Sequence, residues 1–157
     1  MNILFVHQNF PGQYLHIVQR LAKLGGHQLV ALGINPLDQS RELSGSIQHF
    51  QYSLRRGNAK NVHPLVMETE TKVIRAEGCA MAAEQLKNKG FMPDLICAHP
   101  GWGEPLFLKT IWPDAPLLCY QEFFYNESGF DINFDPEFDE RRVWWDQAKL
   151  EMKNAYL

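Results

Sequence analysis

A chain of 157 residues that is 45% hydrophobic and 21% charged can bury one good hydrophobic core but is short for two domains. Its formal net charge of -3 gives no general attraction to nucleic acid or to an anionic membrane surface, so neither partner is predicted. The cysteines are odd in number, and Cys97 and Cys119 lie inside apolar runs, which favours a reducing, cytoplasmic setting over a disulfide framework.

The first predicted element is a buried strand. Residues 2–6, NILFV, form an unbroken apolar run, which is typical of a strand buried on both faces of a parallel sheet. The run is far shorter than the roughly 20 apolar residues of a membrane span, and no basic leader precedes it. We therefore expect a protein without a signal peptide.

Helices and strands then alternate along the chain. Apolar residues recur at helical spacing over residues 14–24, and Gly25 and Gly26 end that helix. Two strands are expected next, at residues 27–33 and, less buried, at residues 46–52.

A long helix is predicted over residues 62–89, with Pro64 in its first turn and Gly90 after its end. A buried strand, a short helix, a fifth strand and a closing helix capped by Asp135 follow, at residues 94–99, 103–112, 115–120 and from 135 onward. Because strands alternate with helices, the predicted fold class is α/β, a Rossmann-like doubly wound parallel sheet with helices on both faces.

In such a sheet, ordered 3-2-1-4-5, the connections after strands one and four leave in opposite directions and open a crevice at the carboxyl ends of the strands. The loop HQNFPGQ (residues 7–13) is longer and more polar than a plain strand-to-helix turn needs. We expect a ligand cleft built from residues 7–13, 99–104 and 120–125. The alternative for the first loop is a hydrogen-bonded turn without a ligand.

Three motifs, in order along the chain, resemble a known family. MNILFVHQNFPGQYLH, PDLICAHPGWGE, and YQEFFY followed by GFDINFDPEFD are similar to the amino-terminal half of family 4 glycosyltransferases, which are retaining enzymes of the GT-B fold. The resemblance covers essentially the whole chain. It implies that residues 1–157 are the acceptor-side, Rossmann-like half of a GT-B fold, and that the carboxyl-terminal donor-binding domain is absent from this chain.

The resemblance also implies an activity. The full-length protein is expected to be a glycosyltransferase of the hexosyltransferase type, which moves a sugar from a nucleotide-sugar donor to a saccharide or lipid-linked acceptor. The isolated chain is expected to be inactive, and no cofactor and no metal are expected. A cytoplasmic location is expected, with a peripheral position at the inner face of the membrane left open. The alternative is a stand-alone Rossmann-like binding or regulatory module without catalysis.

His99 is the candidate catalytic residue. It ends the fourth strand at the crevice, where relatives direct a histidine at the transferred sugar, and a neutral imidazole can donate there to a sugar hydroxyl or carbonyl. A purely structural histidine is the alternative. Because the spacing of His7, His99 and the nearby carboxylates fits no zinc signature, no metal site is predicted.

The other candidates are substrate-binding residues, namely His7, Gln8, Asn9, Phe10, Gly12, Gly101, Trp102, Gly103, Glu104 and Glu122. The two later glycines would let backbone amides approach a ligand, although a tight turn needs them equally. Trp102 can stack on a sugar face, and the two glutamates can accept from acceptor hydroxyls. Glu104 equally suits a helix amino terminus, where the dipole favours a carboxylate. A single glycine, Gly12, stands where many relatives carry a pair, which argues against direct diphosphate contact.

Two surface features remain. The basic loop around Arg55, Arg56 and Lys60 suits either a solvated face or contact with an anionic acceptor. Trp144 and Trp145 are adjacent, so one narrow helical stripe cannot bury both. With the aromatic residues 123–125 they predict an exposed face for the second domain, through which the isolated chain would form a homodimer.

Overall fold

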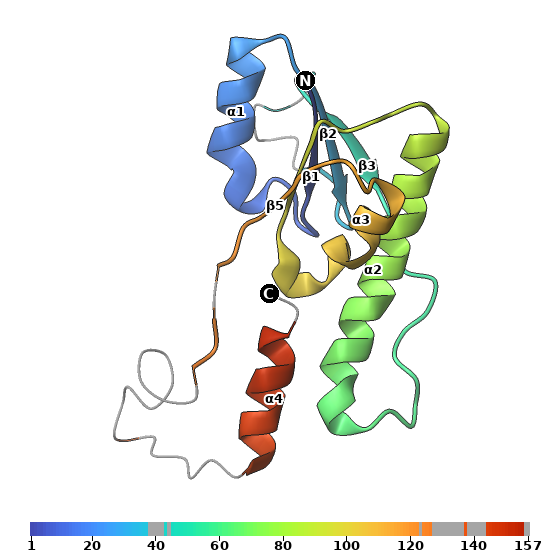
Figure 1. Cartoon of the computed structure of the whole chain (residues 1–157), viewed down its shortest axis with the longest axis vertical. Helices are drawn as coiled ribbons and strands as arrows, with labels where there is room; N and C mark the ends of the chain where they lie inside the picture. Colours follow the sequence, from blue (N-terminus) through green and yellow to red (C-terminus); the bar gives the residue numbers. More distant parts are fainter. Residues whose placement is uncertain (38–42, 44, 123, 127–136, 138–143, 156–157) are drawn as a thin grey trace.

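The computed structural model describes residues 1–37, 43, 45–122, 124–126, 137 and 144–155. Within these residues, five parallel strands form one sheet in the order β3-β2-β1-β4-β5 (Figure 1). The strands are β1 Asn2–Val6, β2 Gln28–Gly33, β3 Gln48–Gln51, β4 Leu95–Ala98 and β5 Leu117–Cys119. The predicted α/β class, the parallel pairing and the 3-2-1-4-5 order are confirmed.

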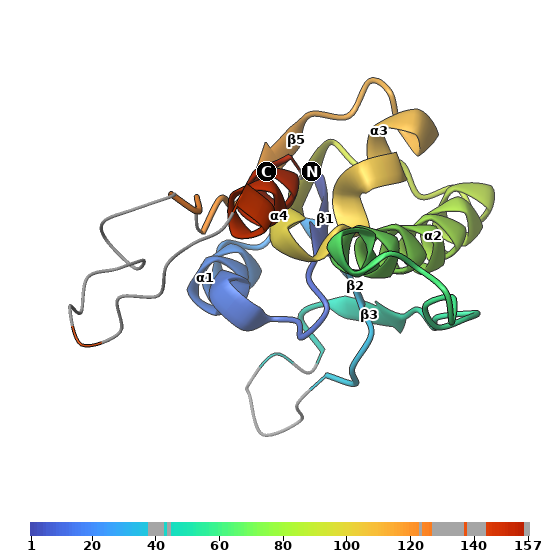
Figure 2. The same cartoon turned by 90° about the horizontal axis from the view of Figure 1, so that it is seen from below.

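Helices cover both faces of the sheet. Figure 2 shows α1 on one face and α2 with α3 on the other. The α-helices are α1 Leu15–Leu24, α2 Pro64–Asn88, α3 Leu108–Ile111 and α4 Trp144–Asn154. The 3-10 turn η1 Gly12–Tyr14 lies between β1 and α1, and η2 Pro100–Trp102 and η3 Glu104–Phe107 lie between β4 and α3.

The helix boundaries follow local sequence signals. Gly25, with φ 68°, ends α1, and Pro64 occupies the first turn of α2, where its missing N–H costs nothing. The short helix expected over residues 103–112 is split, because its first half is the 3-10 turn η3. The predicted start of the closing helix, at residues 135 and 136, lies outside the described residues.

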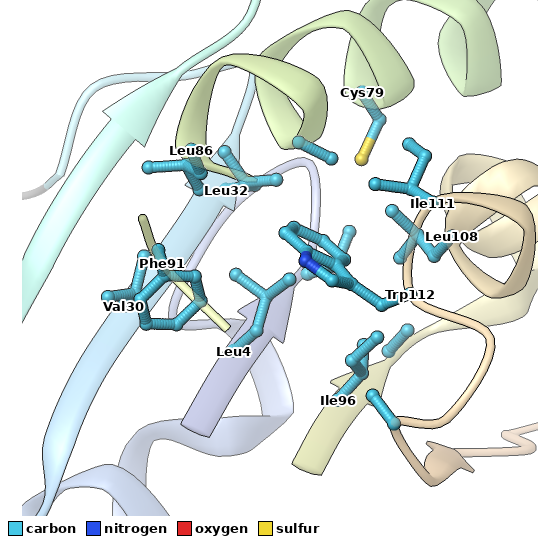
Figure 3. Close-up of a cluster of buried hydrophobic side chains, with 14 of the residues drawn as sticks. Leu4, Val30, Leu32, Cys79, Leu86, Phe91, Ile96, Leu108, Ile111 and Trp112 are labelled. Carbon is cyan, nitrogen blue, oxygen red and sulfur yellow. The ribbon is translucent and has the colours of Figure 1, made fainter. Parts of the chain in front are cut away.

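The unbroken apolar run of β1 serves two cores. Leu4 and Val6 face α2 and α3, where Trp112 and Cys79 are fully buried (Figure 3), whereas Ile3 and Phe5 face α1. Successive side chains of a strand point to opposite faces, so a central strand that is covered on both sides needs apolar residues at every position.

The topology opens the expected crevice. The chain leaves β1 toward α1 on one face and leaves β4 toward η3 and α3 on the other, so the connections that follow these two neighbouring strands diverge. The 25-residue α2 extends beyond these strand ends, and α4 packs against its amino-terminal half (Figure 1). Among the described residues, no helix is both long enough and apolar enough to span a membrane.

Candidate functional site at the crevice

The loop after β1 closes over His7. This histidine is buried, and its Nδ1 accepts a hydrogen bond from the backbone N–H of Asn9 at 3.0 Å. A Cβ on Gly12, where φ is +49°, would lie 2.6 Å from Cε1 of the imidazole. The absence of a side chain at Gly12 therefore leaves space for the ring, and the backbone bond leaves Nε2 as the protonated nitrogen.

Burial lowers the pKa of His7, and the neighbouring His99 lowers it further. The two rings meet edge to face, with centroids 5.5 Å apart. His7 is therefore a neutral imidazole near neutral pH.

The loop after β4 repeats this arrangement. His99 is buried directly after the strand, and a Cβ on Gly101 would lie 2.8 Å from its Cε1. Gly103 has φ +97° and approaches α2 closely, since a Cβ there would lie 2.5 Å from the carbonyl oxygen of Lys72. A side chain at either glycine of this loop would therefore meet its neighbours closely, and Gly103 also has the positive φ that suits a tight turn.

Glu122 joins the two loops. Its Oε2 lies 3.0 Å from Nε2 of His99, and its Oε1 accepts from the side-chain amide of Gln13 at 2.8 Å. The hydrogen bond from Gln13, followed by that from His99, holds the pKa of the Glu122 carboxyl below its ordinary value. A half-exposed, ionised carboxylate therefore stands at the mouth of the crevice.

A pocket of about 500 Å³ opens beside the first loop, lined by His7, Asn9, Phe10, Pro11, Gly12, Gln13, Asn35 and Pro36. The side-chain amide of Asn35 donates to Asn9 Oδ1, and the carbonyl of Gln8 accepts from the backbone N–H of Asn35 at 3.1 Å. We call this the amide pocket. Gln8 contributes to this pocket only through the backbone carbonyl that accepts from Asn35. Phe10 is a buried core residue whose ring stacks on His49.

A second pocket of about 200 Å³ lies on the other side of His99, lined by Glu68, Lys72, His99, Gly101, Trp102, Glu122, Tyr125 and Lys153. Trp102 is exposed on its wall, beneath the guanidinium of Arg75 at 5.4 Å from the ring centroid. We call this the lysine pocket. The two pockets flank the link from Gln13 through Glu122 to His99.

Glu104 lines neither pocket. Its side chain is 1% exposed and accepts a hydrogen bond of 2.8 Å from the hydroxyl of Tyr52, and burial raises its pKa. The expected contact with an acceptor hydroxyl is not available to a carboxyl in this position. Gly103 directly precedes Glu104 and has a positive φ, and the turn of the chain at this glycine directs the Glu104 side chain into the protein interior.

Comparison with known proteins agrees with this fold. Residues 25–157 match the model of the Glycosyl transferase family 4 group. The chain belongs to this family. No curated protein matches it significantly. Among solved structures, apo UGT2 of Phytolacca americana is similar, with a TM-score of 0.52 and 13% identity over 76% of this chain. At that identity the similarity shows the fold alone, and this chain covers only 28% of that protein.

In this family 4 domain, several pocket residues lie outside the segments that the sequence predicted for the cleft. Asn35 joins Asn9 and Gln13 of the predicted first loop in the amide pocket, and Lys72 and Lys153 line the lysine pocket. One signal was present for Lys72. It shares a helical stripe with Ala76 and Cys79, both buried, so a lysine stands where the pattern calls for an apolar residue.

The remaining predicted surfaces lie farther out. Trp145 packs on His63, with ring centroids 5.3 Å apart, whereas Trp144 is 74% exposed. The described part of the predicted aromatic face includes Phe124, which is exposed, while residue 123 lies outside the described residues. Arg56 of the basic loop is paired with Glu70 at 3.2 Å. Within the described residues, no group of three or more His, Cys, Asp or Glu could hold a metal ion.

Proposed function

We propose that this chain is the acceptor-side half of a retaining glycosyltransferase, which moves a hexose from a nucleotide-sugar donor to an acceptor hydroxyl. One observation carries the proposal. His99, His7 and Glu122 meet at the switch point of the sheet, beside an open pocket lined by amides. Membership in the Glycosyl transferase family 4 group supports the class of reaction.

In this proposal, His99 acts by position and polarity. Transfer with departure of a diphosphate develops positive charge on the sugar, and a fixed polar group near the reacting carbon lowers the barrier. Glu122 now accepts at Nε2 of His99 and is half exposed on a loop. A sugar hydroxyl can replace the carboxylate at this nitrogen, which frees Glu122 to accept from a second hydroxyl.

The amide pocket suits the acceptor. Asn9, Gln13 and Asn35 offer both N–H donors and carbonyl acceptors, and His7 is neutral, so the lining matches uncharged hydroxyl groups. A saccharide, free or lipid-linked, is the acceptor class that fits. The groups that clamp the donor diphosphate are proposed to lie in a second domain, which this chain does not contain.

The test is a calorimetric titration of the 157-residue chain with a panel of UDP-, GDP- and ADP-sugars, beside a transfer assay on the chain and on the product of the full reading frame. We expect the chain to bind donors with a dissociation constant of about 1 mM or weaker and to show no turnover. Micromolar binding or transfer by the chain alone would contradict the half-enzyme model. A full-length product without any transfer would favour the binding module.

Location and assembly belong to the same proposal. The three cysteines are free thiols, which supports a cytoplasmic protein. The exposed rings of Trp144 and Phe124 support association of the isolated chain into a homodimer. Light scattering should then give a mass that rises toward twice the monomer mass, and a strict monomer at high concentration would contradict the dimer.

A further inference from the structure

The two histidines of the crevice differ in what fixes their rings. Nδ1 of His7 accepts the backbone N–H of Asn9, so the main chain of its own loop holds the ring of His7. Nδ1 of His99 is buried and has no hydrogen-bond partner among the described residues, whereas its Nε2 lies 3.0 Å from Glu122. Of the hydrogen bonds within the described part of the chain, the one to Glu122 therefore sets the orientation of the His99 ring.

Glu122 is not held in this position by packing. Its side chain is 50% exposed, on the segment that follows β5. Its second oxygen, Oε1, accepts from the side-chain amide of Gln13 at 2.8 Å. An exposed carboxylate that is held at one oxygen alone can adopt several rotamers, so the bond from Gln13 is what keeps Oε2 directed at His99.

Each hydrogen bond in this chain of side chains has one direction. The ionised carboxylate of Glu122 can only accept, so Gln13 and His99 each donate from Nε2. Burial lowers the pKa of His7, and a hydrogen bond with the Gln13 side chain opposes this. Because Nε2 of His7 carries the proton, the side-chain oxygen of Gln13 is the acceptor of that bond. Gln13 thus contacts one histidine directly and the other through Glu122.

We propose that Gln13 is a positioning residue of the reaction centre, which holds Glu122 and, through it, the donor nitrogen of His99. The inference rests on the proposed function, in which the Nε2–H group of His99 meets a sugar hydroxyl. When that hydroxyl takes the place of the carboxylate, the bond from Gln13 keeps Glu122 within reach of a second hydroxyl. Gln13 also lines the amide pocket, so the acceptor and the reaction centre share this side chain.

The first experiment needs no transfer reaction. NMR spectra of the isotope-labelled 157-residue chain follow the titration of the Glu122 carboxyl and the exchange of the His99 Nε2–H proton with water. In Gln13→Ala we expect the pKa of Glu122 to rise toward its ordinary value of 4.5. The His99 proton should exchange at least about 10-fold faster, because its acceptor is no longer held. An unchanged pKa of Glu122 or an unchanged exchange rate would overturn the proposal.

Folding is controlled in the same experiment. Gln13 is exposed in η1, so its side chain contributes little packing and the melting curve of Gln13→Ala should match that of the wild type. Gln85→Ala is the matched control, since this exposed glutamine of α2 lines neither pocket. Equal acceleration of the His99 proton exchange in the Gln13 and Gln85 variants would overturn the assignment.

Two further substitutions separate the hydrogen bond from the shape of the side chain. Gln13→Glu keeps the shape but loses the donor and sets a second carboxylate against Glu122, so exchange of the His99 proton should be fast. Gln13→Lys returns a donor of similar reach and should restore most of the slow exchange. Slow exchange in Gln13→Glu would mean that shape is sufficient and would overturn the role of the bond.

Kinetics of the full-length protein distinguish positioning from acceptor binding. Gln13→Ala should lower kcat about 10-fold at saturating acceptor, because a misplaced polar group stabilises the developing charge less well. Asn35 lines the same pocket but donates to Asn9, so Asn35→Ala should raise the acceptor KM with little change in kcat. A raised acceptor KM with unchanged kcat in both variants would make Gln13 a binding residue alone and overturn the proposal.

A double substitution tests whether Gln13 acts through Glu122. In Glu122→Ala, the further change Gln13→Ala should leave kcat unaltered, because the carboxylate that it holds is already gone. Fully additive losses of kcat would overturn the proposal. The NMR results also separate this inference from the proposed function. If they are as expected in a protein that transfers no sugar, Gln13 keeps its hold on the His99 ring and the glycosyltransferase is removed. Undiminished kcat in Gln13→Ala would retain the enzyme and overturn the positioning role.

Discussion

The loops that leave β1 and β4 begin alike and end differently. Each places a histidine directly after its strand and a glycine beneath the imidazole ring, His7 with Gly12 and His99 with Gly101. The first loop then packs against the chain after β2 and opens on the amide pocket. The second packs against α2 and opens on the lysine pocket, where α2 and α4 supply the charges.

The difference follows from what each loop faces. The first loop lies next to another strand end, which offers backbone groups and short polar side chains such as Asn35. The second faces the amino-terminal part of a helix that extends past the sheet, and such a helix can extend long cationic side chains toward the crevice. The same strand-end geometry thus gives a neutral wall and a charged wall on the two sides of the crevice.

The largest effect is expected where the second loop meets α2. In Gly103→Ala the new Cβ would lie 2.5 Å from the Lys72 carbonyl oxygen, at φ +97°, so both strain and a backbone clash must be relieved. We expect a loss of about 3 kcal/mol or more in the free energy of unfolding, measured by chemical denaturation.

Two glycines provide the controls for that substitution. Gly90 has φ +88° with open space around it, so Gly90→Ala tests strain alone and should cost about 1 kcal/mol. In Gly12→Ala of the first loop the obstacle is the His7 ring, which can turn away, so an intermediate loss is expected. Equal losses in all three variants would contradict the difference between the loops.

The next effect concerns turnover. In the full-length protein, His99→Ala should lower turnover by about 10- to 1000-fold with little change in melting, because a polar group fixed beside developing charge contributes about 2 to 4 kcal/mol. His16→Ala, which removes an exposed histidine from α1, is the control. Undiminished turnover with an unchanged melting temperature would make His99 a structural residue.

The sheet and the location of the site could be predicted because both depend on simple periodicities. The bounds of β1 follow from its unbroken apolar run, and the order of the strands fixes which loops meet. The edge strand β3 is shorter than the range 46–52 predicted for it, and its residues are partly or fully exposed. An exposed edge strand has a weaker alternation of apolar and polar residues, so its ends are harder to predict.

The charged wall could not be predicted in the same way. Lys72 and Lys153 reach the crevice from two helices that are distant in sequence, so their meeting depends on how far α2 projects and where α4 docks. The burial of Glu104 depends on the direction of the chain at Gly103, which the sequence does not specify. Neither quantity appears in hydrophobic spacing.

A smaller effect is expected in the first loop, where His7 should make the free energy of unfolding depend on pH. Burial lowers the pKa of His7, so the unfolded chain binds a proton at a higher pH than the folded chain. Stability from this group is present above its ordinary pKa of 6.5 and is lost as pH falls through the lowered value. His7→Asn keeps an Oδ1 that can accept from the backbone N–H of Asn9 and cannot titrate. Lowering the pH from about 7.5 to 5.5 should therefore reduce the free energy of unfolding less in this variant than in the wild type, by up to about 1 kcal/mol. Chemical denaturation at both pH values measures this change. An equal change in His16→Asn would contradict burial as its cause.

The smallest effect tests the buried carboxyl of the second loop. Burial raises the pKa of Glu104, so its contribution to stability is present below its ordinary pKa of 4.5 and is lost as pH rises through the raised value. Gln at this position keeps an oxygen that accepts from Tyr52 and cannot ionise. The free energy of unfolding of Glu104→Gln should therefore match that of the wild type at about pH 4 and exceed it by up to about 1 kcal/mol at about pH 8, as measured by chemical denaturation.

Glu104→Leu is the control, because it leaves the Tyr52 hydroxyl without this acceptor and should lose about 1–3 kcal/mol of unfolding free energy at both pH values. A Gln variant less stable than the wild type at about pH 8 would mean that the ionised carboxylate stabilises the second loop, and burial would then not be the dominant influence on Glu104.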